Sequence, residues 1–525
     1  MKFLRLFILS GCVALTACAH APKKDRGPNP YYDLVLSNLM AFDGDVEGSI
    51  KNLLKSVEAY PDNAHLKYLA AQRFAEAQNW VKASQYINEA LKIKPKWSAA
   101  KILKGQILEA QGELDKAGVI FSELLKSRPK KEESYFNLSQ NLVHRQKYNQ
   151  AIQVLNSWIA KNPDSVTTLY YIATIQNVYL KDSAQALKSY SRLLQLDPDD
   201  IRVRNQVAQI YLKQNNKEKA LEEFINIERQ FPNDLSIKVQ IASLYQDIGR
   251  VGEAITKLNE ILEINPQADR IHYFLGLLYE KLKEEKKALE HFEKITATSS
   301  VFDDAVLQQA VLLRDLKESK RGTELLRNAI RKHPKVSRFY QFLSLFWEEE
   351  EQMDRAVDAL KDGIKKIPND EELYFNLGSL HDKLKQKEES LKMMRKVLEL
   401  NPKNAAALNY IGYTYAEAGD KLDEAEKLIV EALKIKPGDA YITDSLGWVY
   451  YQKGDLKKAL IFIEKANKRS PNEPVILEHL GDVYLKRGEK SRAKQFFKQA
   501  IEQGRKKEKP NGEEIDRVEE KLKGL

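Results

Sequence analysis

The residues that most often carry enzyme chemistry are sparse and scattered along this 525-residue chain. Histidines can act as general bases or metal ligands, but here none stands at the spacing of a metal-binding or catalytic-triad motif. The eight histidines are His20, His65, His144, His272, His291, His333, His381 and His479. The chain also contains no glycine-rich phosphate-binding loop. The sequence therefore predicts no catalytic site, no metal site and no cofactor.

A second group of residues suits binding rather than catalysis. Four aromatic residues and two polar residues occur close together near the carboxy-terminal end: Tyr413, Tyr441, Trp448, Tyr451, Asn409 and Asp444. Aromatic anchors dominate binding energy at protein interfaces, where truncation often costs ~2 kcal/mol or more, and such rings also stack on sugars. We predict a partner-binding patch, in which Trp448→Ala weakens partner capture but leaves helix content and cooperative unfolding intact. The alternative is that these rings fill the space between structural repeats.

A regular series of prolines reveals the elements that position these residues. Twelve prolines are separated by 34 or 35 residues, apart from one gap of 68 in which Ser300 occupies the missing position. The series is Pro61, Pro95, Pro129, Pro163, Pro198, Pro232, Pro266, Pro334, Pro368, Pro402, Pro437 and Pro471. A repeat of this length indicates a solenoid, in which one supersecondary unit recurs along nearly the whole chain.

Each repeat reads as a hairpin of two helices. Between Leu373 and Pro402, two apolar stretches with a period near 3.6 flank a polar turn. Left-handed residues are expected where the first helices end, at Gly112, Gly249, Gly419, Gly454 and Gly488. Short polar residues after the prolines are expected to cap the next helix, namely Asp62, Asn63, Asp164, Asp199, Asn233 and Asn369.

Three recurring residue types give the repeats a family resemblance. A small residue recurs on the first helix, at Ala71, Gly105, Ala208, Ala242, Gly276, Ser344, Gly378, Gly412, Gly447 and Gly481. An aromatic residue often follows three positions later, at Phe74, Tyr211, Tyr245, Tyr279, Trp347, Tyr415, Tyr450 and Tyr484. Alanine opens the second helix at Ala83, Ala117, Ala151, Ala186, Ala220, Ala254, Ala288, Ala356, Ala425, Ala459 and Ala493. This pattern resembles the tetratricopeptide repeat family.

The resemblance implies an all-α fold, a right-handed α-solenoid superhelix of about fourteen hairpins spanning residues 31–507. Gly322 and Ser390 replace the expected alanine, so the pattern does not predict the helix contact at these two positions. Residues 508–525 should form a capping helix, with Ile515, Val518 and Leu522 on the face that covers the last hairpin.

In this family, fixed positions of each first helix line the concave face. The residue after the small contact residue is one of them, which predicts a groove lined by Gln72, Gln106, Gln140, Thr174, Gln209, Ser243, Leu277, Val311, Leu345, Tyr413 and Trp448. The glutamines could hydrogen-bond an extended peptide, and the apolar middle stretch could accept hydrophobic side chains or a partner helix. Alternatively, the glutamines are simply good exposed helix formers.

The first thirty residues indicate where in the cell the protein is located. Lys2 and Arg5 precede an apolar run, Leu6 to Leu15, that is too short to span a membrane. The following Leu15-Thr16-Ala17-Cys18 resembles the lipobox of a bacterial lipoprotein signal. That resemblance implies removal of residues 1–17 and lipidation of Cys18. Ala19 then favours the periplasmic face of the outer membrane, since an aspartate there would favour retention in the inner membrane.

Two further expectations follow from the same segment. Residues 18–30, rich in proline and poor in apolar side chains, should form a flexible tether. Cys12 is the only other cysteine, so the mature chain would have neither a free thiol nor a disulfide. The alternative interpretation is a plain secreted protein cleaved elsewhere.

The distribution of charge and the arrangement of the repeats limit the possible classes of function. The net charge of +9 is spread among interspersed acidic and basic residues, without the basic stripe that nucleic acid binding needs. The whole-chain plan resembles outer-membrane lipoproteins that recruit a carboxy-terminal processing protease to cell-wall hydrolases. The runs Asn409-Tyr410-Ile411-Gly412-Tyr413 and Asp444-Ser445-Leu446-Gly447-Trp448 look like their last repeats. We therefore predict a non-enzymatic periplasmic adaptor.

The alternatives are a scaffold subunit of an exopolysaccharide or pilus secretion machine and a wall-glycan-binding module.

Overall fold

The computed structural model describes residues 30–507 and 511–525, where all regular secondary structure is helical. Residues 1–17, Cys18 and the tether that follows lie outside the described residues, so the predictions made for them are not addressed by the fold. None of the described helices combines the length and apolar character that crossing a bilayer requires. The chain divides into two compact units, unit 1 up to Arg250 and unit 2 from Val251 to Leu525.

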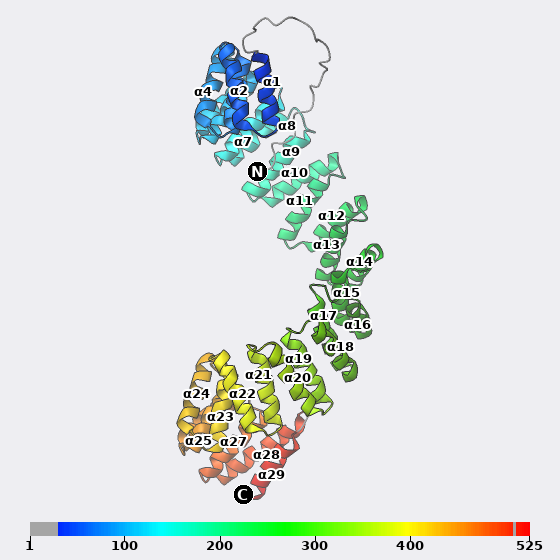
Figure 1. The fold of residues 1–525 in the computed structure, drawn as a ribbon, viewed down its shortest axis with the longest axis vertical. Coiled ribbons are helices and arrows are strands. Elements are labelled where there is room, and N and C mark those ends of the chain that lie inside the picture. Colours follow the sequence, from blue (N-terminus) through cyan, green and yellow to red (C-terminus); the bar gives the residue numbers. More distant parts are fainter. Residues whose placement is uncertain (1–29, 508–510) are drawn as a thin grey trace. The chain divides into compact units, whose positions relative to one another are not determined.

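Unit 1 contains six helical hairpins followed by a single helix (Figure 1). The hairpins are formed by α1 (Pro30–Phe42) and α2 (Val46–Ala59), α3 (Ala64–Glu76) and α4 (Trp80–Ile93), α5 (Ser98–Ala110) and α6 (Leu114–Ser127), α7 (Glu132–His144) and α8 (Tyr148–Ile159), α9 (Val166–Thr174) with its π-helical extension η1 (Ile175–Tyr179) and α10 (Ser183–Leu196), and α11 (Ile201–Lys213) and α12 (Lys217–Gln230). The single helix is α13 (Leu235–Asp247).

Unit 2 begins with α14 (Val251–Ile264), continues with seven hairpins and ends with a lone helix, α29 (Gly512–Lys523). The hairpins are α15 (Asp269–Lys281) and α16 (Glu285–Glu293), α17 (Phe302–Asp315) and α18 (Ser319–Lys332), α19 (Ser337–Glu349) and α20 (Met353–Lys366), α21 (Glu371–Lys383) and α22 (Lys387–Leu400), α23 (Ala405–Ala418) and α24 (Leu422–Ile435), α25 (Ala440–Gln452) and α26 (Leu456–Arg469), and α27 (Pro474–Lys486) and α28 (Lys490–Lys506). The predicted all-α repeat fold with a final single helix is confirmed.

Close contact between the two helices of a hairpin explains the recurring small residues. A Cβ atom added at Gly105, Gly276 or Gly481 would overlap the phenyl ring of the facing helix. The two irregular positions are filled in other ways. The space at Gly322 is taken by the ring of Phe346, and the buried Ser390 donates a hydrogen bond to the Tyr410 hydroxyl at 2.7 Å. Both positions are therefore closely packed.

The turns confirm one expectation and correct another. All five glycines predicted to be left-handed have positive φ, between +67° and +84°. The predicted caps Asp164, Asp199, Asn233 and Asn369 are wrong by one residue, because the capping side chains are Ser165, Asp200, Asp234 and Asp370. Asp62 likewise gives way to its neighbour Asn63, which does cap α3.

The shift has a simple backbone cause. The carbonyl before each proline accepts a hydrogen bond from the amide three residues later, as from Asp200 to Asp197 at 3.3 Å and from Asp234 to Phe231 at 3.0 Å. Proline suits the second position of such a turn. The turn includes the residue after proline, so the helix starts one residue later than predicted.

Repeats whose length differs from 34 residues differ from the others only in local helix length or turn conformation. In the 35-residue repeat that ends at Pro198, the extra residue widens the end of the first helix into η1, with a hydrogen bond from Leu180 N to Ile175 O at 3.1 Å. In the repeat that ends at Pro437, α23 is one residue longer than α21 and Lys421 adopts a left-handed conformation. Where Ser300 stands in place of the missing proline, α16 ends early at Glu293.

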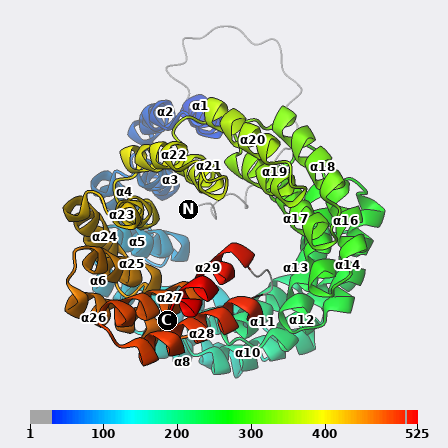
Figure 2. The same ribbon diagram turned by 90° about the horizontal axis from the view of Figure 1, so that it is seen from below.

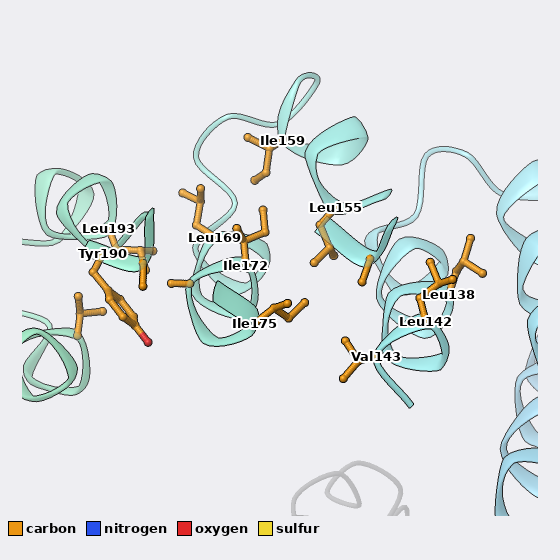
Figure 3. Packing of buried hydrophobic residues seen from close by; sticks show 14 of the residues in the cluster. Leu138, Leu142, Val143, Leu155, Ile159, Leu169, Ile172, Ile175, Tyr190 and Leu193 are labelled. Atoms are coloured by element: carbon orange, nitrogen blue, oxygen red, sulfur yellow. The ribbon is translucent and has the colours of Figure 1, made fainter. Parts of the chain in front are cut away.

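Each unit is held together by apolar clusters that run from hairpin to hairpin. Figure 3 shows one in unit 1, where Leu138, Leu155, Ile172 and Tyr190 from successive hairpins are buried in one continuous cluster. Because each repeat contacts mainly its neighbours, the core is a strip with two ends. At the carboxy-terminal end of unit 2, Val518 is buried, and Ile515 and Leu522 pack against the same cluster. The predicted apolar face of the capping helix is confirmed.

Candidate binding groove of unit 2

A cavity of about 690 Å³ opens on the inner side of unit 2. In Figure 2, the first helices α21, α23, α25 and α27 form this inner side, while α22, α24 and α26 lie outside them. The cavity reaches from Phe375 on α21 to Lys521 on α29. Because it opens along a row of first helices, its lining is set by repeated sequence positions.

Helix geometry brings these side chains to one face. Asn409 and Tyr413 are four residues apart on α23, and Asp444 and Trp448 are four apart on α25, so each pair shares a helix face. Asp482 follows Trp448 by one repeat length of 34 residues and takes the equivalent place on α27. The repeat therefore turns a short sequence pattern into a row of side chains along the cavity wall.

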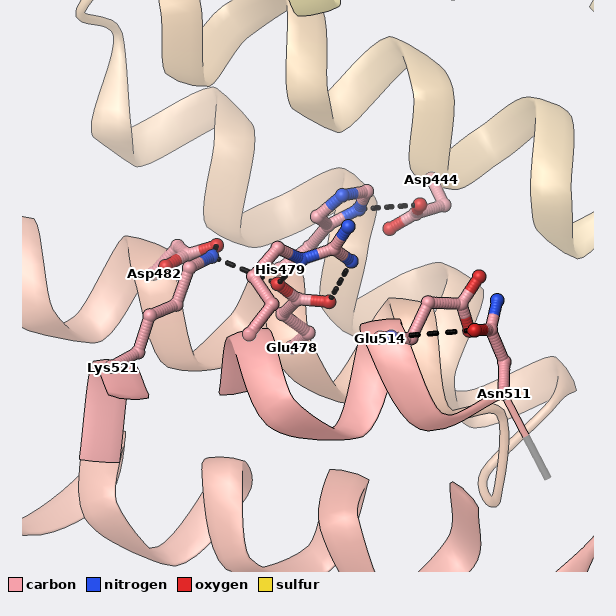
Figure 4. A network of polar contacts seen from close by, with 8 residues as sticks. Asp444, Glu478, His479, Asp482, Asn511, Glu514 and Lys521 are labelled. Carbon is pink, nitrogen blue, oxygen red and sulfur yellow. Dashed lines mark hydrogen bonds and ion pairs between the residues drawn. The ribbon is translucent and has the colours of Figure 1, made fainter. Parts of the chain in front are cut away.

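A buried ion pair lies at the centre of the cavity wall. His479 Nδ1 lies 2.7 Å from Asp444 Oδ2, and both side chains are almost completely buried (Figure 4). Burial alone would lower the pKa of His479, but the negative charge of Asp444 and its hydrogen bond, helped by Glu478 and Asp482, raise this pKa above its ordinary value. The imidazolium form is thus favoured in the folded state.

The aromatic residues form a stacked column rather than open platforms. The Trp448 indole stacks on His479 with ring centroids 4.1 Å apart, and on Tyr451 at 4.6 Å. The Lys486 ammonium lies 4.3 Å from the centre of the Tyr451 ring. Both faces of the indole are therefore covered by protein. This packing adds an expected cost in stability to Trp448→Ala, beside the predicted loss of partner capture.

The capping helix supplies two cations to the end of the cavity. Arg517 contacts both oxygens of the buried Glu478, at 3.0 and 2.7 Å, and Lys521 Nζ lies 2.9 Å from Glu478 and 2.6 Å from Asp482. Burial would raise the pKa of Glu478, but the hydrogen bonds from Arg517 and Lys521 lower it. For Asp482 burial prevails, and its pKa is raised. These contacts fix α29 to α27.

Three buried polar atoms on the cavity wall have no hydrogen-bond partner among the described residues: Asn409 Oδ1, Asp444 Oδ1 and Trp448 Nε1. Buried polar atoms are nearly always paired, so each such exception calls for an explanation. Two of the atoms accept hydrogen bonds and one donates. A peptide backbone or a side-chain amide offers both kinds of group. Burial, with nearby Glu417 and Asp444, also raises the pKa of Tyr413, so its hydroxyl stays protonated.

The predicted binding residues separate into those the cavity gathers and those it does not. Asn409, Tyr413, Tyr441, Asp444 and Trp448 line the cavity. Tyr451 packs behind Trp448 instead. The remaining predicted groove residues are elsewhere on first helices: Gln106, Gln140, Gln209 and Ser243 are exposed, and Gln72, Thr174, Leu277, Val311 and Leu345 are half-buried.

Sequence reasoning did not single out the charged part of the site. The missed residues are Glu478, His479, Asp482, Arg517 and Lys521. Glu478 and Asp482 stand one repeat length after Asp444 and Trp448, a signal that the regular spacing offered. No such spacing marks Arg517 and Lys521, because α29 follows the last complete repeat.

His272 and His291 pair between the two helices of one hairpin. His272 and His291 lie 3.0 Å apart between their Nδ1 atoms, and His272 Nε2 lies 3.0 Å from the Pro266 carbonyl. Burial, with the nearby His272 and Lys294, lowers the pKa of His291 to about 4. His291 is therefore neutral at pH 7 and shares this hydrogen bond with His272 inside a hairpin. Across residues 30–507 and 511–525, no three His, Cys, Asp or Glu side chains gather as a metal site would require.

Comparisons with known proteins agree with the repeat pattern. A family model described as tetratricopeptide repeat matches residues 226–506, and a second with the same description matches residues 179–240. No curated protein matches the chain.

Solved structures with similar folds are distant in sequence. The Cut9 complex with Hcn1, an APC/C hetero-tetramer, is 14% identical, covers 86% of this chain and 96% of its own, and has a TM-score of 0.34. Yeast Tom70 is 13% identical, covers 94% and 95%, and has a TM-score of 0.32. MamA from Desulfovibrio magneticus RS-1 is 21% identical, covers 33% and 97%, and has a TM-score of 0.29.

Proposed function

The chain belongs to the tetratricopeptide repeat family, and from that premise we propose that it is a non-enzymatic scaffold that holds segments of partner proteins in the groove of unit 2. The observation that carries this proposal is the cavity itself, whose wall combines the rings of Tyr413 and Trp448 with polar and charged side chains such as Asp444. Concave sites with apolar walls and a few convergent polar groups are typical of binding sites.

The preferred occupant is a protein segment rather than a sugar. Stacking on a sugar ring needs an open aromatic face, and the indole of Trp448 has none because His479 and Tyr451 cover both of its faces. A peptide can instead place an apolar side chain in the cavity, whose wall includes Phe375. Tyr441, which is 55% exposed, adds an apolar contact where the cavity opens.

The proposed location is the periplasmic face of the outer membrane. It is supported by the lipobox-like Leu15-Thr16-Ala17-Cys18 and by Ala19. Cys18→Ser should abolish lipid attachment, measured by incorporation of radiolabelled fatty acid. If the exported and processed variant stayed on the membrane to the same extent, a second anchor would have to exist.

Within this framework, the finer proposal is recruitment of a carboxy-terminal processing protease to cell-wall hydrolases. It is supported by the likeness of the repeats around Tyr413 and Trp448 to those of lipoprotein adaptors. A scaffold role in a polysaccharide or pilus secretion machine remains the other candidate. The partners captured in cells distinguish the two.

Site-specific photo-crosslinking tests the groove directly. A photoreactive amino acid is placed at Tyr441 at the cavity, or at Ile461 on α26 as a matched control, because the two residues are similarly exposed at 55% and 62%. We expect protein adducts in intact cells from position 441 and not from position 461. A protease and hydrolases among the adducts would support the adaptor, and a secretin or synthase the secretion scaffold. Equal labelling from both positions, or capture of peptidoglycan alone, would refute the proposed groove.

A further inference from the structure

Helix α1 exposes a row of large apolar side chains to solvent. Tyr32, Val35, Leu39 and Phe42 are 65%, 57%, 57% and 90% exposed. Their spacing of three, four and three residues places them in one stripe along the helix. Such a stripe normally faces the interior of a protein.

The face of α1 that meets the rest of unit 1 carries polar as well as apolar side chains, since Leu34 packs against the cluster around Leu53. Ser37 is buried and its hydroxyl lies 3.0 Å from that of Ser49 on α2. Asp33 is also buried, and Lys55 Nζ lies 3.6 Å from its carboxylate. The helix therefore buries two polar side chains while four large apolar ones stay exposed, and a contiguous exposed apolar patch marks an interaction surface.

The last helix of unit 2 shows how a solenoid end is normally finished. Helix α29 packs its apolar side chains inward, and Glu513, Asp516, Glu520 and Lys523 are exposed on its outer side. Terminal repeats need such a polar outer face to stay soluble. Helix α1 has no such polar outer face, which indicates that something other than water covers it.

We propose that the stripe of Tyr32, Val35, Leu39 and Phe42 docks on the surface of a lipid bilayer. Amphipathic helices bind in this way by placing an apolar face at the boundary of headgroups and acyl chains. Tyrosine and phenylalanine suit that depth. The inference rests on the proposed lipid anchor for one step: Cys18 precedes Pro30 by twelve residues, which holds α1 within roughly 45 Å of the anchoring leaflet.

A second copy of the chain fits the stripe less well. Four side chains of these types offer on the order of 500 Å² of apolar surface. A stable dimer interface needs about 800 Å² from each partner. A lipid surface has no such requirement, because it surrounds each side chain without needing a complementary shape.

The charges of α1 make the proposal specific. Its only charged residue is Asp33, which is buried beside Lys55. Docking should therefore depend on apolar contact alone, and it should be equally strong on zwitterionic and anionic vesicles and insensitive to salt. A helix that binds through lysine and arginine would prefer anionic lipid.

The test uses the chain starting at Ala19, which keeps every described helix and contains no cysteine. A single cysteine at Leu39, or at Asp516 on the outer side of α29 as a control, is labelled with an environment-sensitive fluorophore. Vesicles of phosphatidylcholine, or of phosphatidylethanolamine and phosphatidylglycerol, are then added. We expect a blue shift at position 39 with both vesicle types and none at position 516.

A second variant separates docking from folding. With the fluorophore at position 35, Phe42→Glu should weaken vesicle binding about tenfold or more, because it places a charge in the docked face. Helix content should not change, since residue 42 is almost fully exposed. No lipid-dependent shift at position 39 would overturn the proposal. A shift that follows protein concentration without lipid would also overturn it, in favour of a dimer. Neither result affects Cys18 lipidation or crosslinking at Tyr441, which are tested separately.

Discussion

Replacing Glu478 by glutamine tests whether the buried charges hold the capping helix. Glu478 accepts two hydrogen bonds from Arg517 and one from Lys521, and its side chain is almost completely buried. Glutamine is nearly isosteric but neutral, and it offers one acceptor oxygen instead of two. The variant therefore removes charge and one acceptor without leaving a cavity.

The expected loss is about 2 kcal/mol. Breaking a buried ion pair costs about 3–5 kcal/mol. Two features reduce this value: Arg517 is 53% exposed and regains water, and Lys521 keeps Asp482 at 2.6 Å. Because each element of a solenoid contacts only its neighbours, most of the loss should appear as local opening of α29. A change of about 2 kcal/mol corresponds to roughly 30-fold less protection of its amides from hydrogen exchange.

Hydrogen exchange of residues 512–523, read by mass spectrometry, is the assay. The matched control is Glu502→Gln, which removes the pair with Lys506, where both side chains are 61% exposed. Surface pairs of this kind contribute little, so exchange of α29 should stay at the wild-type rate. The pKa of Glu478 is lowered in the folded state. Its contribution is therefore present above the unfolded pKa, about 4.3, and is lost as pH falls through the folded value.

The outcome that would refute this reasoning is equal exchange in the two variants at neutral pH. In that case apolar packing of Val518 alone would hold α29. A difference between Glu478→Gln and the wild type that persisted at pH 2 would also contradict the electrostatic explanation.

Three further predictions concern the stability of unit 2, measured by urea denaturation. The pKa of His479 is raised in the folded state, so the stability that its protonated form contributes is complete below the unfolded pKa of about 6.5 and is lost as pH rises through the folded pKa. Asp444→Asn should reduce this loss of stability with rising pH. An unchanged slope of the free energy of unfolding against pH would contradict the pairing of His479 with Asp444. Gly481→Ala should destabilise by about 1–3 kcal/mol because its Cβ meets Phe497, whereas Gly252→Ala, with open space around it, should stabilise by about 0.5–1 kcal/mol. Trp448→Ala should cost about 2–3 kcal/mol through its lost stacking; an unchanged midpoint would show that the stacked rings do not stabilise the fold.

Much of the fold was predictable because the sequence patterns that specify it lie within single repeats. Proline spacing placed the hairpins, and the glycines placed the left-handed turns that the structure contains. The error at the caps, where Asp200 replaces Asp199, came from a turn that includes one more residue than the propensity of single residues indicates.

The site was predictable only in part. Tyr413, Asp444 and Trp448 were found because they follow the repeat, and the structure places them on one cavity wall. The role of Tyr451 and the covered faces of Trp448 could not be predicted from spacing, because stacking depends on side-chain rotamers in two neighbouring helices, α25 and α27.

By itself, the sequence determined the repeat, the helical hairpins and the positions that face inward, since all of these follow from periodicity along one chain. Only the tertiary structure decided which charges meet. Asp444 and His479 come from different hairpins, Glu478 meets Arg517 from α29, and α1 exposes its apolar stripe while burying Ser37. Pairing and burial are properties of neighbouring elements, and no single helix contains that information.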